Sequence, residues 1–171
     1  MSKRKLKSYL QELSKEELEE QILELHDRLK EVKEFYDFVF NPNENKRVEE
    51  AKFKIGKEYF PPSNRKAKKR RSVAQKFIKE FVKLGMEPIL IADIMLYNVE
   101  IVLAFTAETT INQDAFYKSM LKSFEEAVDY IDKNGLQASC NPRIEKIIDQ
   151  VYEQNWINKS AFENVMMKRI N

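Results

Sequence analysis

The sequence predicts an all-α protein, an irregular bundle of about nine helices with no β-sheet. Apolar residues recur at helical spacing almost throughout the chain. Only 3 of the 171 residues are Gly and 5 are Pro, too few turn residues for a sandwich or a barrel. A chain of this length can bury about 70% of the surface that it exposes when unfolded. One core is therefore expected to form without disulfides or metals.

The first two helices are separated by a capping box. The first helix carries apolar residues from Leu6 to Leu13. Ser14 and Glu17 form the box, in which the serine oxygen accepts from a free amide and the glutamate accepts from the serine amide. Four apolar residues then recur at helical spacing and form what we call the leucine seam: Leu18, Ile22, Leu25 and Leu29. The seam makes these helices a candidate surface for pairing with a partner protein or a second copy.

Prolines end the next two predicted helices. The third helix is expected over Val32–Phe40, and it stops before Pro42. The fourth is expected from about Glu44 to Phe60. Pro61 and Pro62 end it, because proline lacks the amide hydrogen and restricts the residue before it.

Five further helices are expected after residue 71. Ser72 and Gln75 have the spacing of a capping box at the start of the first of them. Gly85 and Gly135 are expected to end two of these helices, since glycine adopts the left-handed conformation that helix ends favour. The expected starting residues are Ser72, Pro88, Asn112, Asn141 and Lys159.

The most apolar segment, Pro88–Ala107, is long enough to span a membrane. It contains Asp93, Asn98 and Glu100, which would be costly in lipid, so it is predicted to be a central core helix. The basic N-terminus is followed by charged residues where a signal peptide needs an apolar stretch. The single cysteine, Cys140, fits a reducing interior. These observations predict a cytoplasmic protein with no membrane partner.

Charge is distributed unevenly along the chain. Residues 1–83 hold 22 Lys and Arg against 15 Asp and Glu, whereas residues 84–171 hold 8 against 13. Six of the seven residues from Arg65 to Arg71 are basic. This segment follows two prolines and is the most plausible linker. We expect an N-terminal helical subdomain over 1–62, a basic linker or loop over 63–71 and a C-terminal helical core over 72–171, which could pack into one compact unit.

The basic run is the strongest functional signal in the sequence. Clustered Lys and Arg side chains neutralise phosphates and release counterions, which is the sequence-independent part of nucleic-acid affinity. The run has no interleaved aromatic residue that could stack on single-stranded bases. The leading hypothesis is a non-enzymatic binding or adaptor protein whose basic loop and following helix contact nucleic acid, RNA or DNA, through phosphates, with structured RNA as one candidate. An acidic protein surface is the other partner class. The predicted contact residues are Arg65, Lys66, Lys68, Lys69, Arg70, Arg71, Lys76, Lys79 and Lys83.

Two alternatives remain open at this point. One is a protein–protein scaffold that uses the leucine seam. The other is an enzyme that uses Asp93 and Glu100, which share one helix face and could form an acid–base pair or hold a metal. The two positions lie about 10 Å apart along a helix axis, which is long for a shared proton and favours a structural polar stripe. With one histidine, one cysteine and no glycine-rich phosphate loop, no metal site, cofactor or catalytic residue is predicted. The sequence does not give the oligomeric state.

Several motifs resemble a known family. They are Ser72–Lys76, Lys83–Pro88, Leu90–Glu100, Phe116–Met120 and Phe124-Glu125. Together they are similar to an uncharacterised bacterial family of small helical proteins, a domain of unknown function, with the best match over residues 72–125. The resemblance implies a helical cytoplasmic protein. It implies no known activity, so no catalytic residue is carried over from the family.

Overall fold

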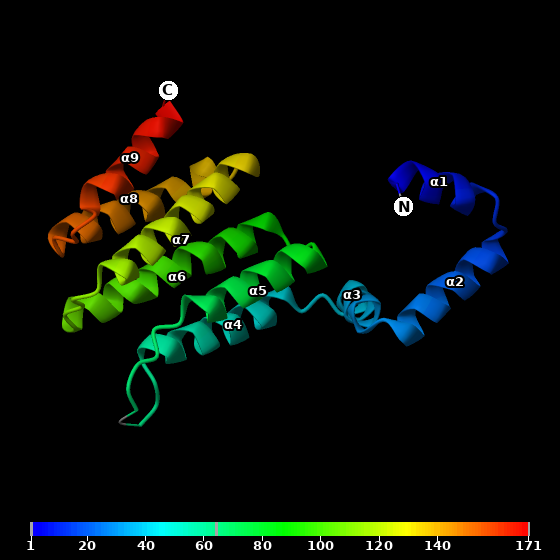
Figure 1. Cartoon of the computed structure of the whole chain (residues 1–171), viewed down its shortest axis with the longest axis horizontal. Helices are drawn as coiled ribbons and strands as arrows, with labels where there is room; N and C mark the ends of the chain where they lie inside the picture. Colours follow the sequence, from blue (N-terminus) through cyan, green and yellow to red (C-terminus); the bar gives the residue numbers. More distant parts are fainter. Residues whose placement is uncertain (1, 64, 171) are drawn as a thin grey trace. The chain divides into compact units, whose positions relative to one another are not determined.

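The computed structural model describes residues 2–63 and 65–170. These residues form nine helices and no strand (Figure 1), which confirms the all-α prediction. Contacts divide the chain into two units, one up to Asn43 and one from Glu44 onward. The predicted boundary lay later, in the 63–71 segment. The difference arises because the fourth helix packs against the fifth and sixth, and so belongs with the C-terminal core.

The N-terminal unit consists of α1 (Lys3–Gln11), α2 (Lys15–Arg28) and α3 (Lys30–Phe40). The predicted capping box is present, with the Ser14 amide 2.8 Å from Glu17 Oε2 and the Glu17 amide 3.2 Å from Ser14 Oγ. Helices α2 and α3 contact each other. The leucine seam remains largely open to solvent: Leu18 is half-buried, and the other three residues are between 43% and 47% exposed.

The C-terminal unit is built around one helix. Its six helices are α4 (Glu44–Tyr59), α5 (Arg71–Leu84), α6 (Pro88–Glu108), α7 (Asp114–Lys133), α8 (Gln137–Glu153) and α9 (Lys159–Ile170). Helix α6 packs against α4, α5, α7 and α8, and α9 packs against α7 and α8 (Figure 1). The apolar segment is therefore the central helix, as predicted. Its most buried side chains include Ile91, Ile94, Leu96, Val99, Val102 and Leu103.

Length and composition would let α6 cross a membrane, and it is the one helix in the described part of the chain with this property. Within this structure, 56% of its apolar window is buried by the protein. The core helix of a bundle passes the same test of length and composition, and α6 has neighbours on several sides.

Helix starts differ from the sequence expectations more than helix ends do. Gly85 ends α5 with φ of 72°, as predicted. The expected capping box at Ser72 does not form, because the Gln75 side chain donates to Glu126 on α7 and α5 already begins at Arg71. Helix α8 likewise begins at Gln137, ahead of the expected start, and includes Pro142 in its second turn. Long-range side-chain contacts and tertiary packing thus override local capping signals.

Candidate nucleic-acid interface

The basic loop is fastened at its C-terminal end to helix α4. Arg70 donates to both oxygens of Glu58, with Nε 2.8 Å from Oε2 and Nη2 2.7 Å from Oε1. Glu58 is only 7% exposed, and its hydrogen bonds with Arg70 hold the pKa of its carboxyl below the ordinary value. The amide of Lys69 donates to the Glu58 carbonyl at 3.0 Å. Arg70 therefore closes the loop onto the end of α4, and its guanidinium is already occupied by a carboxylate.

Arg71 is also engaged within the protein. Its Nε lies 2.6 Å from Ser123 Oγ and its Nη2 lies 2.6 Å from Glu126 Oε2, so it ties the start of α5 to α7. Gln75 donates to the same Glu126 oxygen at 3.0 Å. Two of the nine predicted contact residues, Arg70 and Arg71, thus have partners that hold the fold together.

The other seven predicted contact residues are presented differently. Within residues 2–63 and 65–168, none of them forms an ion pair with a carboxylate. Six are exposed and Lys69 is half-buried. Four lie in the loop and three follow along one face of α5. We call this set the open basic face: Arg65, Lys66, Lys68, Lys69, Lys76, Lys79 and Lys83.

The region around the open basic face carries a large excess of positive charge. Residues 44–83 contain 14 Lys and Arg against 5 Asp and Glu, although the whole chain has a formal charge of only +2. Such a local excess creates a positive potential that attracts polyanions and increases their association rate. The excess lies on the loop and on α5, which holds four basic residues and one acidic residue, whereas α4 holds five basic and four acidic residues.

Exposed aromatic side chains on the same helix pair were missed by the sequence analysis. Phe53 on α4 is 63% exposed, and Phe60, directly after the end of α4, is 43% exposed. The Nζ of Lys57 lies 3.9 Å from the centroid of the Phe53 ring. A signal was available in the sequence, because Phe53 falls outside the apolar stripe that Val48, Ala51, Ile55 and Tyr59 form.

Asp93 and Glu100, the candidate catalytic pair, are joined by a shared arginine. Arg143 of α8 lies 2.7 Å from Asp93 Oδ1 through Nη1, and 2.8 Å from each Glu100 oxygen through Nε and Nη2. Lys52 of α4 lies 2.8 Å from Asp93 Oδ2. We call these four residues the Arg143 network. They connect α4, α6 and α8, so both carboxylates already have cationic partners.

The network also sets the protonation of its members. Burial raises the pKa of Asp93, but hydrogen bonds from Lys52 and Arg143 outweigh burial and leave the pKa below its ordinary value. Hydrogen bonding with Glu100 raises the pKa of the Arg143 guanidinium. Asp93 and Arg143 are therefore both charged at neutral pH. Among the described residues, no group of three His, Cys, Asp or Glu side chains is placed to hold a metal ion.

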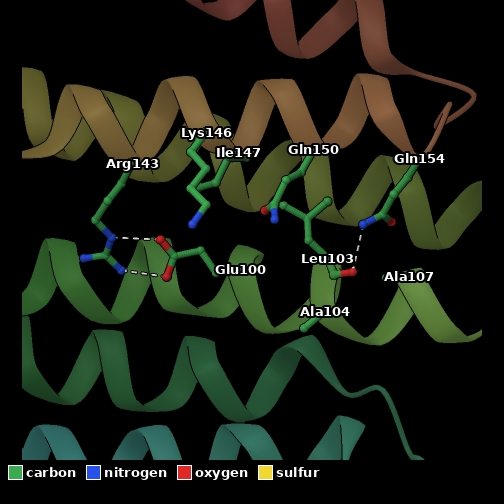
Figure 2. Close-up of a pocket in the computed structure, with 9 residues that line it drawn as sticks. All are labelled: Glu100, Leu103, Ala104, Ala107, Arg143, Lys146, Ile147, Gln150 and Gln154. Atoms are coloured by element: carbon green, nitrogen blue, oxygen red, sulfur yellow. Dashed lines mark hydrogen bonds and ion pairs between the residues drawn. The ribbon is translucent and has the colours of Figure 1, made fainter.

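A groove of about 380 Å³ lies between α6 and α8 beside this network. Figure 2 shows the Glu100–Arg143 pair at one end and Gln154 at the other, where Gln154 Nε2 donates to the Leu103 carbonyl at 3.0 Å. The Lys146 ammonium points into the groove between them (Figure 2). The polar groups at both ends are thus bound to the protein itself. The lining residues are Glu100, Leu103, Ala104, Ala107, Arg143, Lys146, Ile147, Gln150 and Gln154.

The fold and this surface define a class: an all-α protein built on one apolar helix, with its excess of positive charge on one loop and the helix that follows it. The chain belongs to a family of unknown function, DUF6155, whose sequence profile covers residues 1–169. This confirms the resemblance to a domain of unknown function and extends it beyond residues 72–125. Comparisons with curated proteins and with solved structures gave no match.

Proposed function

We propose that this protein is a non-enzymatic, cytoplasmic binding or adaptor protein that contacts nucleic acid through the open basic face. The observation that carries the proposal is the division of the predicted cations into two sets. Arg70 and Arg71 are used to build the loop and helix start, whereas the other seven form no ion pair with a carboxylate among the described residues. Charges that the fold does not need are available to phosphates.

The arrangement favours phosphate contacts over reading of the base sequence. Six of the seven side chains are lysines and the seventh, Arg65, lies in the loop. Among the described residues, none is paired with a residue that would orient it toward a base edge. Lys76, Lys79 and Lys83 extend over about 10 Å of the α5 axis. Binding should therefore be tolerant of sequence and strongly dependent on salt.

The test is a salt series with a loop variant in which Arg65, Lys66, Lys68 and Lys69 are all changed to Gln. Removing four phosphate contacts should flatten the slope of log affinity against log salt by roughly 3 units for single strands and 3.6 for a duplex. Arg70 and Arg71 are left intact, so circular dichroism and the melting temperature should not change.

A control variant makes the same change in net charge elsewhere on the C-terminal unit. It replaces four other exposed lysines, none of them in an ion pair among the described residues, with Gln: Lys118, Lys122, Lys133 and Lys168. Its salt slope should stay close to that of the native protein. The proposal fails if the native protein does not bind nucleic acid at low salt, or if the two variants lose affinity equally.

A second candidate function, protein scaffolding, is favoured by the exposure of the leucine seam. Its residues follow the 4-3-4 spacing of a coiled-coil seam, and Ile22, Leu25 and Leu29 remain 43%, 47% and 45% exposed, respectively. A second copy of the same helix is the occupant that fits this spacing. Sedimentation should show a dimer that Ile22→Glu with Leu25→Glu converts to a monomer. A native protein that is monomeric at every concentration would leave this candidate without its interface.

A further inference from the structure

We infer that the nucleic acid bound at the open basic face is single-stranded, with one base stacked on Phe53. The inference rests on the proposed function and adds the class of ligand. Phe53 is 63% exposed, although α4 has a well-formed apolar stripe that faces the core. Full burial of a phenylalanine side chain would contribute about 1.5–3 kcal/mol to the stability of the fold. An exposed aromatic ring within a cationic surface is the arrangement by which proteins hold single strands.

The Phe53 ring is flanked by groups that suit a stacked nucleotide. The Lys57 ammonium lies 3.9 Å from its centroid and covers one ring face by a cation–π contact. The exposed area of Phe53 therefore lies on the opposite face and the edge, where a base can stack. The same ammonium is close enough to attract the phosphate of that nucleotide.

Phe60 extends the aromatic surface along α4. It directly follows Tyr59, the last residue of α4, and its amide donates to the Gly56 carbonyl at 2.8 Å. Its ring contacts Phe105 of α6 edge-on, with the centroids 5.9 Å apart, and it is still 43% exposed. One side of the Phe60 ring is thus held by Phe105 and the rest is open to solvent, as a second stacking position requires.

The cations of α5 lie on the helix that packs against α4. Helices α4 and α5 pack against each other (Figure 1), and Lys54 of α4 reaches across with its Nζ 5.5 Å from the Phe77 ring of α5. Packed helices lie about 8–10 Å apart, a distance that one nucleotide bridges from its phosphate to its base. A single strand could therefore place its phosphates on the α5 lysines and its bases on the α4 rings.

A duplex would use only half of this surface. Its bases are already paired and stacked, so Phe53 could not reach a base face without opening the helix. An anionic membrane would also attract lysines and accept phenylalanines. The observations favour a single strand because the exposed rings and the cations lie on a loop and two packed helices, rather than on one amphipathic helix.

The experiment compares three probes: a 20-nucleotide poly(U) RNA, a 20-base-pair duplex and vesicles containing phosphatidylglycerol. Fluorescence anisotropy measures binding to the two oligonucleotides, and co-sedimentation measures binding to the vesicles. Phe53→Ala should weaken poly(U) binding by about 5- to 150-fold, the range measured for loss of one stacked base. Duplex binding should change by less than about twofold. Phe40→Ala removes a phenylalanine of α3 that is 75% exposed, and this change should affect the binding of neither oligonucleotide.

The outcomes separate this inference from the proposed function. If duplex binds at least as tightly as poly(U) and Phe53→Ala has no effect, the stacking inference is overturned while phosphate binding stands. If neither oligonucleotide binds the native protein, both fail. Vesicle binding that depends on Phe53 without oligonucleotide binding would also overturn both and identify a membrane surface. Circular dichroism confirms that each variant is folded.

Discussion

Replacing Arg143 with Met tests whether the Arg143 network serves the fold. Arg143 makes three short contacts with carboxylates, two with Glu100 and one with Asp93. Breaking a fully buried ion pair costs about 3–5 kcal/mol, and an exposed pair contributes about 0–1 kcal/mol. These side chains are intermediate, with 34% of Arg143, 25% of Asp93 and 32% of Glu100 exposed. Lys52 would still pair with Asp93, and Glu100 could be rehydrated. We therefore expect a loss of about 2 kcal/mol.

Urea denaturation at pH 7, followed by circular dichroism, measures this loss. Lys146→Met is the matched control, because Lys146 lies one turn further along α8, borders the same groove and is exposed without an ion pair among the described residues. Its effect should stay within about 0.5 kcal/mol. A double-mutant cycle of Arg143→Met with Glu100→Gln should give a coupling energy of about 1 kcal/mol.

The pH dependence gives an independent check. The folded pKa of Asp93 lies below the ordinary value of 3.8. A carboxyl with a lowered folded pKa contributes stability that is present above the unfolded pKa and lost as the pH falls through the folded pKa. The difference in stability between native protein and Arg143→Met should therefore be largest near neutral pH and shrink below about pH 4.

One result would refute the structural role of the network. Residues held in place for binding or chemistry commonly reduce stability, so replacing them makes a protein more stable. If Arg143→Met or Glu100→Gln raises the free energy of unfolding, the charges are kept for a function at the groove, and the enzyme alternative regains its basis.

Three further predictions concern stability and use the same urea assay. Asn98→Leu should stabilise the protein by about 1–2 kcal/mol, because Asn98 is 1% exposed and neither polar atom of its side chain has a hydrogen-bond partner among the described residues; a loss of stability would mean that the amide binds an ordered water. Gly56→Ala should stabilise α4 by about 0.5–1 kcal/mol, since the new Cβ meets only the end of the Tyr97 side chain at 3.2 Å; destabilisation would show that Tyr97 cannot shift. Arg71→Gln should cost about 1–2 kcal/mol through its two contacts with α7, whereas Lys68→Gln should change nothing; equal effects would contradict the division of the basic run.

Local patterns were sufficient to predict the helices of this protein. Apolar spacing, the Ser14 capping box and Gly85 each depend on residues within a few positions, and each is present as expected. The Ser72 capping box failed because Gln75 bonds instead to Glu126, 51 residues away. Competition from a distant partner leaves no trace in a local pattern.

The same limit applies to the candidate sites. Spacing places Asp93 and Glu100 on one face of a helix, but it cannot show that Arg143, on another helix, bridges them. A run of six cations also gives no indication of which ones the fold uses. The pairing of Arg70 and Arg71 depends on Glu58 and Glu126, which only tertiary packing brings close to these two arginines. Whether the remaining cations bind nucleic acid stays a prediction.

The anchoring of the basic loop has a consequence for limited proteolysis. Trypsin cleaves after Lys and Arg, and exposed segments are its preferred targets. Arg65, Lys66 and Lys68 offer such sites, whereas Arg70 and Arg71 are held by α4 and α7. A cut there would separate α4 from α5 in the chain, yet both helices pack against α6. The nicked protein should therefore migrate as one species until it is denatured, and a bound polyanion should delay the cut.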